Sequence, residues 1–325
     1  MSNYSDPLLN SIAERLASDD AGIRRVAAMD LVDSAEDEAV DLLLIALNDD
    51  DEAVRMEAAK VIDEFDPKEM MGALVGALTS KDDNVRNAAA NALADLKDKD
   101  AAPALLAALN EGDAFVVSAI LRALKQLRIK EVRPYAINYL SHADATVRRE
   151  AVSVLGYLQD VENLPQIMSV ASSDTDVEVR RTAVGALVFA SAAQVSQALI
   201  KALSDENWLV KIEAIKGIGR LSVFDAVDNL IAATQDSIWQ VQEKAVEAIG
   251  KLKAYEGIPA LANCIANPIS NLRKSTVAAL GEIAHTDGLE LIHIGMNDND
   301  PDVRKLARWA LEQVENNNSN SKVSG

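Results

Sequence analysis

The chain has 325 residues, of which 49% are apolar but only 4% aromatic, with 14 glycines and 8 prolines. A chain so poor in strand-forming aromatic residues and in turn residues is not typical of a large β protein. The net charge of −19 argues against non-specific binding to nucleic acid or to an anionic membrane, because both need a positive contacting face. The single cysteine cannot form an intramolecular disulfide.

The N-terminal segment has no targeting pattern. Residues 1–16 contain neither the basic start nor the apolar run of a secretory signal. Nowhere does the chain approach the roughly 18 uninterrupted apolar residues of a membrane span. We therefore expect a soluble, cytoplasmic protein in which residues 1–7 lead into the first structural unit.

A Val-Arg pair returns along the chain at a nearly constant interval, which indicates a repeat protein. The second residue of each pair serves below as the marker from which positions are counted. In chain order the markers are Arg24, Arg55, Arg86, Val117, Arg148, Arg180, Lys211, Gln242, Arg273 and Arg304. The interval is 31 residues, except for 32 between Arg148 and Arg180. Ten units therefore cover about residues 8–315.

Each unit carries two helical patterns. Position −1 is aliphatic throughout, position +3 is alanine in eight units, and position +7 is leucine or isoleucine, which together form one face of a helix. Position −4 is aspartate in seven units, as expected of an N-cap. Earlier in the unit, apolar i, i+4 pairs such as Leu43 and Leu47 predict a first helix.

Two units depart from the capping pattern, because Ile238 and Ile269 occupy position −4 there. We expect Ser237 and Ser270 to cap helices whose first residues are shifted. The polar segment 316–325, NNNSNSKVSG, lacks helical periodicity and is expected to be disordered.

The segments DDEAVRMEAAKVI, DATVRREAVSVLG and DPDVRKLARWAL resemble HEAT repeats, in particular the short bacterial kind first noted in phycobiliprotein lyases. The resemblance implies an all-α fold, in which ten antiparallel helix pairs stack into a single right-handed α-solenoid over residues 8–315. It also implies a ladder between the Asp of each turn and the Arg of a neighbouring second helix. We expect interruptions where Val117 and Gln242 replace the arginine.

No pattern for catalysis or metal binding is present. None of the three histidines is followed by glutamate, as in the iron-binding HEAT-like deoxyhypusine hydroxylases. HEAT-like DNA glycosylases have a basic DNA-facing surface, which the acidic composition does not favour. Cys264 aligns with alanines of other units, which indicates a packed residue rather than a nucleophile. We predict no catalytic residue, no metal and no cofactor.

The three tryptophans stand at positions that are not obligatory core positions in the other units. Trp208 and Trp239 are both at position −3 in adjacent units, and Trp309 is at position +5. Exposed aromatic residues of this kind are frequent at binding hot spots. The alternative interpretation is local packing against a loop.

Basic residues gather at positions +1 and +5 of the second helices, including Arg122, Arg149, Arg181 and Lys216. The HEAT resemblance places second helices on the concave face. A basic stripe beside the tryptophans would form a groove for an acidic protein segment or an anionic ligand. The alternative is an ordinary solvated helix surface.

We therefore expect a non-catalytic protein-interaction module that acts as adaptor, scaffold or assembly factor through its concave face. A maturation factor for a metalloenzyme would differ only in the partner. The alternative from another class is a subunit of a bilin lyase or a chromophore-handling chaperone, with the basic stripe holding the propionates. The oligomeric state is not indicated.

The charge is unevenly distributed along the chain. Residues 1–113 hold 26 acidic and 10 basic residues, whereas residues 114–325 hold 25 and 22. The argument against nucleic acid is therefore strongest for the first repeats. Basic partners are expected to favour those repeats, and acidic ones the groove around units five to eight.

Overall fold

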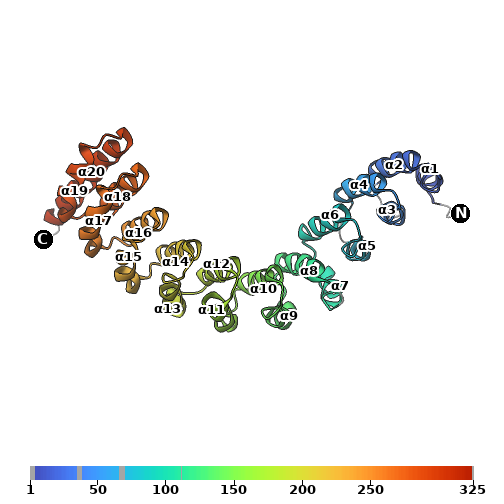
Figure 1. Ribbon diagram of the computed structural model, residues 1–325, viewed down its shortest axis with the longest axis horizontal. Helices are drawn as coiled ribbons and strands as arrows, with labels where there is room; N and C mark the ends of the chain where they lie inside the picture. The colour runs from blue at the N-terminus through green and yellow to red at the C-terminus, as the bar shows by residue number, and fades with distance from the viewer. Residues whose placement is uncertain (1–3, 35–38, 66–69, 111, 324–325) are drawn as a thin grey trace. The chain divides into compact units, whose positions relative to one another are not determined.

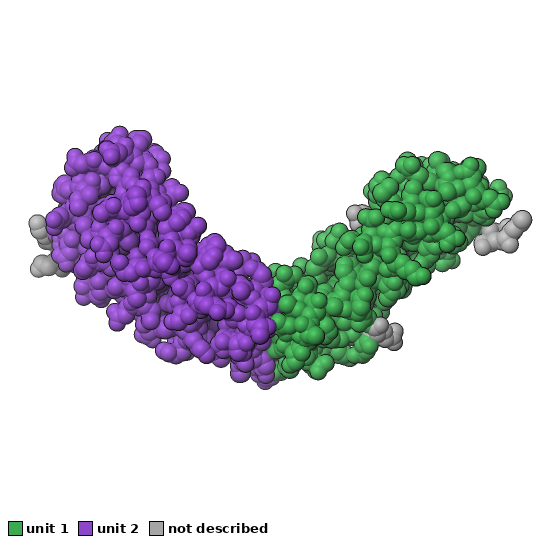
Figure 2. All heavy atoms as spheres, viewed as in Figure 1, with its two compact units in different colours: residues 1–158 green, residues 159–325 purple. Residues whose placement is uncertain are grey.

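The computed structural model describes residues 4–34, 39–65, 70–110 and 112–323, and none of these residues lies in a strand. The all-α prediction is confirmed: the described residues form ten helix pairs, each joined by a tight turn (Figure 1). The contacts divide the chain into two compact units, 1–158 and 159–325, which Figure 2 colours separately. Each unit holds five pairs. That the ten pairs form one continuous solenoid stays a prediction.

In unit 1 the pairs are, in chain order, α1 (Pro7–Leu16) and α2 (Ala21–Met29), α3 (Val40–Leu47) and α4 (Glu52–Val61), α5 (Met71–Ala77) and α6 (Asp83–Ala94), α7 (Ala102–Ala108) and α8 (Ala114–Leu127), α9 (Arg133–Tyr139) and α10 (Ala145–Tyr157). In unit 2 they are α11 (Leu164–Ser173) and α12 (Val177–Ala186), α13 (Ala192–Ala202) and α14 (Trp208–Leu221), α15 (Val227–Ala233) and α16 (Trp239–Lys251), α17 (Ile258–Ile265) and α18 (Ser270–Ile283), α19 (Leu289–Met296) and α20 (Pro301–Val323).

Short 3-10 segments lie between many of these helices. They are η1 (Asp30–Ser34), η3 (Ile62–Glu64), η4 (Lys99–Ala101), η5 (Lys130–Val132), η6 (Val161–Asn163), η7 (Leu187–Phe189), η8 (Phe224–Ala226), η9 (Tyr255–Gly257) and η10 (Thr286–Gly288).

Within each unit the second helices form one row and the first helices another (Figure 1). The second helices pack more extensively on each other than the first helices do. The ten residues at position +3 are all 0% exposed, so the predicted small residue of the second helix lies in the core. At Gly250 the approach is close, because a Cβ there would lie 2.8 Å from the Cα of Ala279 on the next second helix.

The N-caps follow the sequence pattern in most pairs. The Asp51 carboxylate, for example, accepts from the backbone N–H of Ala53 at 2.9 Å. The shifted starts expected at Ser237 and Ser270 are wrong. Helices α16 and α18 begin after Ile238 and Ile269, neither of which makes a side-chain cap.

A ladder of ion pairs joins successive second helices to the turns that follow them. The pairs, marker first, are Arg24–Asp49, Arg55–Asp82, Arg86–Asp113, Arg180–Asp205, Lys211–Asp236 and Arg273–Asp298. An arginine marker also donates to carbonyls of its own turn, as Arg180 Nη1 does to the Asp174 oxygen at 2.9 Å. Each such marker therefore links two adjacent repeats.

The ladder carboxylate occupies one of two positions. In most pairs it stands two residues before the N-cap and also accepts the N-cap backbone N–H, as Asp205 does from Asn207 at 2.8 Å. In the turn with Ser80 at that position, the N-cap Asp82 itself pairs with the arginine. Position −4 therefore does not identify the ladder partner by itself.

Both expected interruptions are found among the described residues. Val117 has no polar group, and Gln242 Nε2 donates only to the Asp236 carbonyl of its own turn, at 2.6 Å. In the turns that follow, the position two residues before the N-cap is His142 or Asn267 rather than aspartate. Where the marker carries no charge, the next turn therefore has no carboxylate two residues before its N-cap. No acid at that position is left without its cation.

The C-terminal segment differs from expectation. Helix α20 continues through Val323, so residues 316–323 are helical rather than disordered, and residues 324–325 lie outside the described residues. Extending an existing helix costs little once its first turns have formed. The Asn317 amide also donates to the Ala284 carbonyl at 2.9 Å, which ties the extension to the end of α18.

Candidate partner-binding surface

The residues predicted to bind a partner are divided between the two units. Arg122 on α8 and Arg149 on α10 belong to unit 1. The remaining residues all belong to unit 2, namely Arg181, Trp208, Lys216, Trp239 and Trp309. Each set is described within its own unit.

Trp208 and Trp239 are the first residues of α14 and α16, two neighbouring second helices. Trp208 is 36% exposed and Trp239 is half-buried. No ring contact joins the two indoles among the described residues. An N-terminal helix position holds each indole next to the turn, at the edge of the row of second helices. The two rings thus occupy equivalent positions one repeat apart, and both are partly exposed.

Trp309 has a packing role. A Cβ on Gly281 would lie 2.3 Å from Trp309 Cζ3, so the indole rests directly on the bare backbone of α18. It nevertheless remains 38% exposed. The interpretation of local packing, left open by the sequence, therefore applies to one face of this ring.

The basic residues of unit 2 lie close to acidic ones. Arg181 pairs with Glu178 at 3.0 Å, and Lys216 with Glu213 at 3.6 Å, each across one helical turn. Lys274 lies 3.4 Å from Asp300 and 3.2 Å from Asp302 in the first turn of α20. These three cations of the row are therefore paired with carboxylates.

The basic residues of unit 1 are also engaged. Arg122 Nη2 donates to the Ala90 carbonyl at 3.1 Å and to the Asn91 side chain at 2.9 Å, across to α6. Arg149 lies 3.9 Å from Glu150. Arg122 therefore links adjacent repeats as much as it presents charge.

Sequence reasoning missed the acidic partners of these cations. The signal was present, because Glu178 with Arg181 and Glu213 with Lys216 stand at i, i+3, a spacing at which opposite charges meet on a helix. Lys274 gave no such signal, since its acids lie about 26 residues later and come close only through the stacking of repeats.

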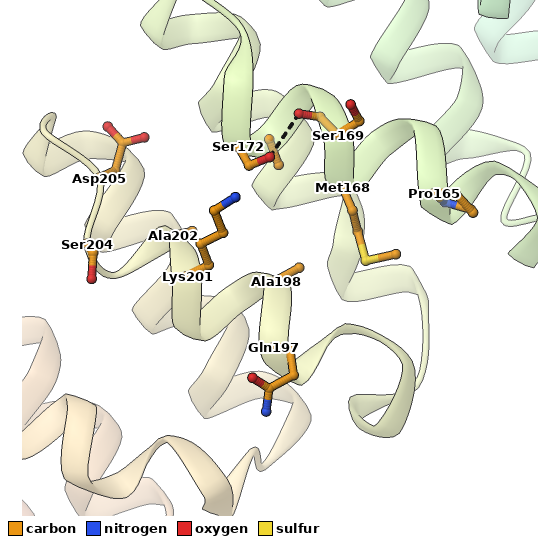
Figure 3. A pocket seen from close by; sticks show the side chains of 11 residues that line it. Pro165, Met168, Ser169, Ser172, Gln197, Ala198, Lys201, Ala202, Ser204 and Asp205 are labelled. Carbon is orange, nitrogen blue, oxygen red and sulfur yellow. Dashed lines mark hydrogen bonds between the residues drawn. The ribbon is translucent and has the colours of Figure 1, made fainter.

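A hollow of about 510 Å³ lies between the first helices α11 and α13 of unit 2. Figure 3 shows Lys201 reaching toward Ser172, with Met168 and Gln197 on the facing walls. The Ser172 hydroxyl donates to the Ser169 carbonyl at 3.1 Å, so it is already satisfied within α11. Most of the residues that line the hollow are small, and they are mixed in polarity. Such a lining suits a partner side chain better than a buried cofactor.

A second hollow, of about 650 Å³, adjoins Trp309 and the ends of α16 and α18. Burial raises the pKa of Glu282 there, while the charge of Lys251 acts in the opposite direction. The indole, the carboxyl and the lysine form a surface of mixed polarity.

The remaining candidate groups have structural explanations. Cys264 is 2% exposed, and burial raises the pKa of its thiol to about 11, which is unsuited to a nucleophile. Within the described ranges, no group of three or more His, Cys, Asp or Glu residues is placed to hold a metal ion. No helix formed by those residues is long and apolar enough to cross a membrane.

Stacked helix pairs with buried alanines at a fixed phase and a ladder of ion pairs define an α-solenoid repeat protein. The family model for HEAT repeats matches most of the chain, in four segments that overlap in two pairs, 9–69 with 40–125 and 133–200 with 196–278. The chain belongs to the HEAT-repeat family. No curated protein matches the sequence.

Solved structures with the same fold have low sequence identity. Kap95 in the Kap95:Nup1 complex is 15% identical, with a TM-score of 0.60 over 94% of this chain and 50% of that one. Importin beta is 16% identical, with a TM-score of 0.60 over 95% and 54%. YibA of E. coli is 15% identical, with a TM-score of 0.53 over 97% and 99%. The chain thus spans about half of the Kap95 and importin beta chains.

Proposed function

We propose that the protein is a non-catalytic interaction module whose unit 2 binds a protein partner along its row of second helices, with Trp208 and Trp239 as anchors. The observation that carries the proposal is the pair of partly exposed indoles at equivalent positions of α14 and α16. Indoles bury much apolar area and keep an N–H donor, which makes tryptophan frequent at interface hot spots. The role would be that of an adaptor, scaffold or assembly factor.

The charge pattern of the row supports a protein partner. Paired charges such as Arg181 with Glu178 give a surface of mixed sign, which orients a partner segment more than it attracts an anion. The alternative of a bilin-lyase subunit depends on cations free to hold two propionates. Arg181 and Lys216 are each paired with a glutamate, which does not favour that role.

Proteins of similar fold also favour this function. Kap95 has been solved in complex with Nup1, and another structure describes Kap95p binding to RanGDP. Within HEAT solenoids the more closely packed row of helices is the concave one, and here that row is formed by the second helices. We therefore propose that the partner binds to this row and that the row forms the concave face.

The test is crosslinked affinity capture from the native host with three versions of the full chain. These are the wild type, the double variant Trp208→Ala/Trp239→Ala and the control Phe224→Ala. Phe224 is 63% exposed in η8 and lies outside the row, so its removal deletes an exposed aromatic ring without touching the proposed surface.

The expected result is a specific protein captured by the wild type and the control and reduced at least tenfold in the double variant. Loss of two hot-spot tryptophans costs about 2 kcal/mol or more each, which accounts for such a reduction. Circular dichroism of the double variant must match the wild type. Equal capture by the wild type and the double variant would refute the tryptophan anchors.

A further inference from the structure

The first helix pair of unit 1 leaves an apolar face uncovered. Ile23, Val26 and Met29 on α2 and Val32 in η1 are 44%, 49%, 47% and 47% exposed. They follow one another at intervals of three residues, which keeps them on one broad side of the helix and of the 3-10 turn after it. These four residues are named here the N-terminal apolar face.

The exposure of Ile23 has a clear cause. Ile23 stands at position −1, and the equivalent residues of the other pairs in unit 1, among them Val54 and Val85, are at most 3% exposed. Each of those residues has a helix pair before it in the stack, whereas α2 has only α1 and the pair after it. The face is therefore the side on which a stack would receive one more element.

The composition of the face indicates that it is covered in function. Positions +2 and +5 of the next pair hold Glu57 and Lys60, whereas the first pair has Val26 and Met29 there. A terminal repeat that faces only water needs a polar outer surface.

In the last helix pair of unit 2, a position that is apolar in the pairs before it carries a polar residue. Position +4 is a buried aliphatic residue in the first four pairs of unit 2, such as Val246 and Val277, but it is the exposed Arg308 in the last. Position +4 of α20 is thus polar, whereas α2 exposes Ile23, Val26 and Met29.

The surroundings of the face select the chemistry of its occupant. Asp19 and Asp20 lie exposed at the start of α2, Asp33 lies exposed just after its end, and Glu14 lies exposed on α1. The nearby arginines are engaged elsewhere, Arg24 with Asp49 and Arg25 with Glu57. Residues 1–158 contain 29 acidic and 17 basic residues. An apolar strip bordered by carboxylates complements a helix with an apolar face and basic flanks.

A second copy of the chain fits less well. Two copies meeting through this face would bring two net negative units together. Helix α2 has 9 residues and so spans about 14 Å. Four side chains on such a helix fall short of the roughly 800 Å² per partner buried in a typical stable interface, but they match two to three turns of an added helix.

We propose that the N-terminal apolar face binds a basic amphipathic helix of a partner protein, which packs on α2 where a preceding repeat would lie. This site is separate from the tryptophan surface of unit 2 and does not depend on it. The partner's leucine-like residues would cover Ile23, Val26 and Met29. Its lysines or arginines would reach the carboxylates at the two ends of α2.

The test uses fluorescein-labelled synthetic peptides and anisotropy in about 0.15 M salt, at which the longer-range charge attraction is largely screened. One 18-residue peptide has a leucine face and lysine flanks, and the second has the same leucine face with glutamate flanks. The proteins are the wild type, Val26→Gln/Met29→Gln, and the matched control Ile45→Gln. Ile45 is 53% exposed on α3 in the same unit but outside the face. All variants keep the net charge.

The lysine peptide is expected to bind the wild type and Ile45→Gln at least tenfold more tightly than the glutamate peptide, and to lose tenfold or more in Val26→Gln/Met29→Gln. The Trp208→Ala/Trp239→Ala variant is expected to bind it like the wild type, which separates this site from the proposed function. Equal binding of the two peptides, no binding of either, or no loss in the double glutamine variant overturns the proposal. Light scattering that detects a wild-type dimer abolished by Val26→Gln/Met29→Gln also overturns it, because the occupant would then be a second copy.

Discussion

Replacing Arg180 by glutamine should destabilise unit 2 by about 3 kcal/mol, because a buried carboxylate then loses its cation. Arg180 Nε and Nη2 hold the two oxygens of Asp205 at 2.8 and 2.9 Å, and the two side chains are 7% and 10% exposed. Burial by itself would raise the pKa of the Asp205 carboxyl. The hydrogen bonds from Arg180 and the backbone of Asn207 outweigh burial and hold this pKa below its usual value.

Glutamine is chosen because the chain already uses it at this position. Gln242 keeps the hydrogen bond to its own turn. In the next turn Asn267 takes the place of the ladder carboxylate and still accepts a backbone N–H at 3.0 Å. The double variant Arg180→Gln/Asp205→Asn therefore copies a neutral combination of residues that the fold tolerates. We expect each single variant to lose about 2–3 kcal/mol and the double variant to lose less than their sum by about 1.5 kcal/mol or more.

The measurement is urea unfolding followed by circular dichroism at 222 nm, with free energies taken from midpoint and slope. The matched control is Arg304→Gln. Arg304 Nη1 donates to two carbonyls of its own turn, and no carboxylate partner is found for it among the described residues. It should lose about 1 kcal/mol or less. Losses below about 1 kcal/mol for Arg180→Gln, or strictly additive effects in the double variant, would contradict the ladder as a stabilising link.

Three further results are expected. Ala284→Gly should raise the free energy of unfolding by about 0.5–1 kcal/mol, because Ala284 has φ 53° at the end of α18, a conformation that glycine adopts without strain. The control Ala190→Gly, at φ −95°, should not stabilise the protein. A higher melting temperature for Ala190→Gly than for Ala284→Gly would contradict this reasoning. Stability should be level near pH 7 and fall below about pH 4, since the pKa values of ladder carboxyls such as Asp205 are lowered on folding and their contribution is lost as they protonate; an unchanged urea midpoint at pH 3 would contradict it. The Cys264 thiol, with a pKa raised to about 11, should react with iodoacetamide at pH 8 about 100-fold more slowly in the folded protein than in urea, and equal rates would exclude its burial.

Much of the fold could be predicted from the sequence, because each repeat encodes its own helices locally. The period of 31, the aliphatic position −1 and the alanine at +3 predicted which residues enter the core, and every residue at +3 is buried. The aspartate N-caps were predicted in the same way, whereas the ladder and its two interruptions at Val117 and Gln242 were expected from the resemblance to HEAT repeats. These features depend on contacts within about one helical turn or on one repeated phase, which a linear pattern records.

The candidate surface was predicted less completely. The positions of Trp208 and Trp239 at the starts of second helices followed from phase alone. That Trp309 rests on Gly281, and that Lys274 meets Asp300, did not, because those residues are separated by 26 residues or more and meet only when repeats stack. The pairing of Lys274 depends on stacking in the same way, whereas Arg181 and Lys216 pair with acids three residues away on their own helices, a spacing that the sequence already contained.

The sequence by itself thus determined an all-α repeat array, its core positions and its caps, since these follow from periodicity and local hydrogen bonding. Only the tertiary structure decided which carboxylate serves each arginine of the ladder, that α20 extends to Val323, and that α2 carries an uncovered apolar face. The physical reason is that these features depend on what lies beside a residue in the stack. A neighbour supplies burial and charge at Val54 and Asp205, and its absence leaves Ile23 open.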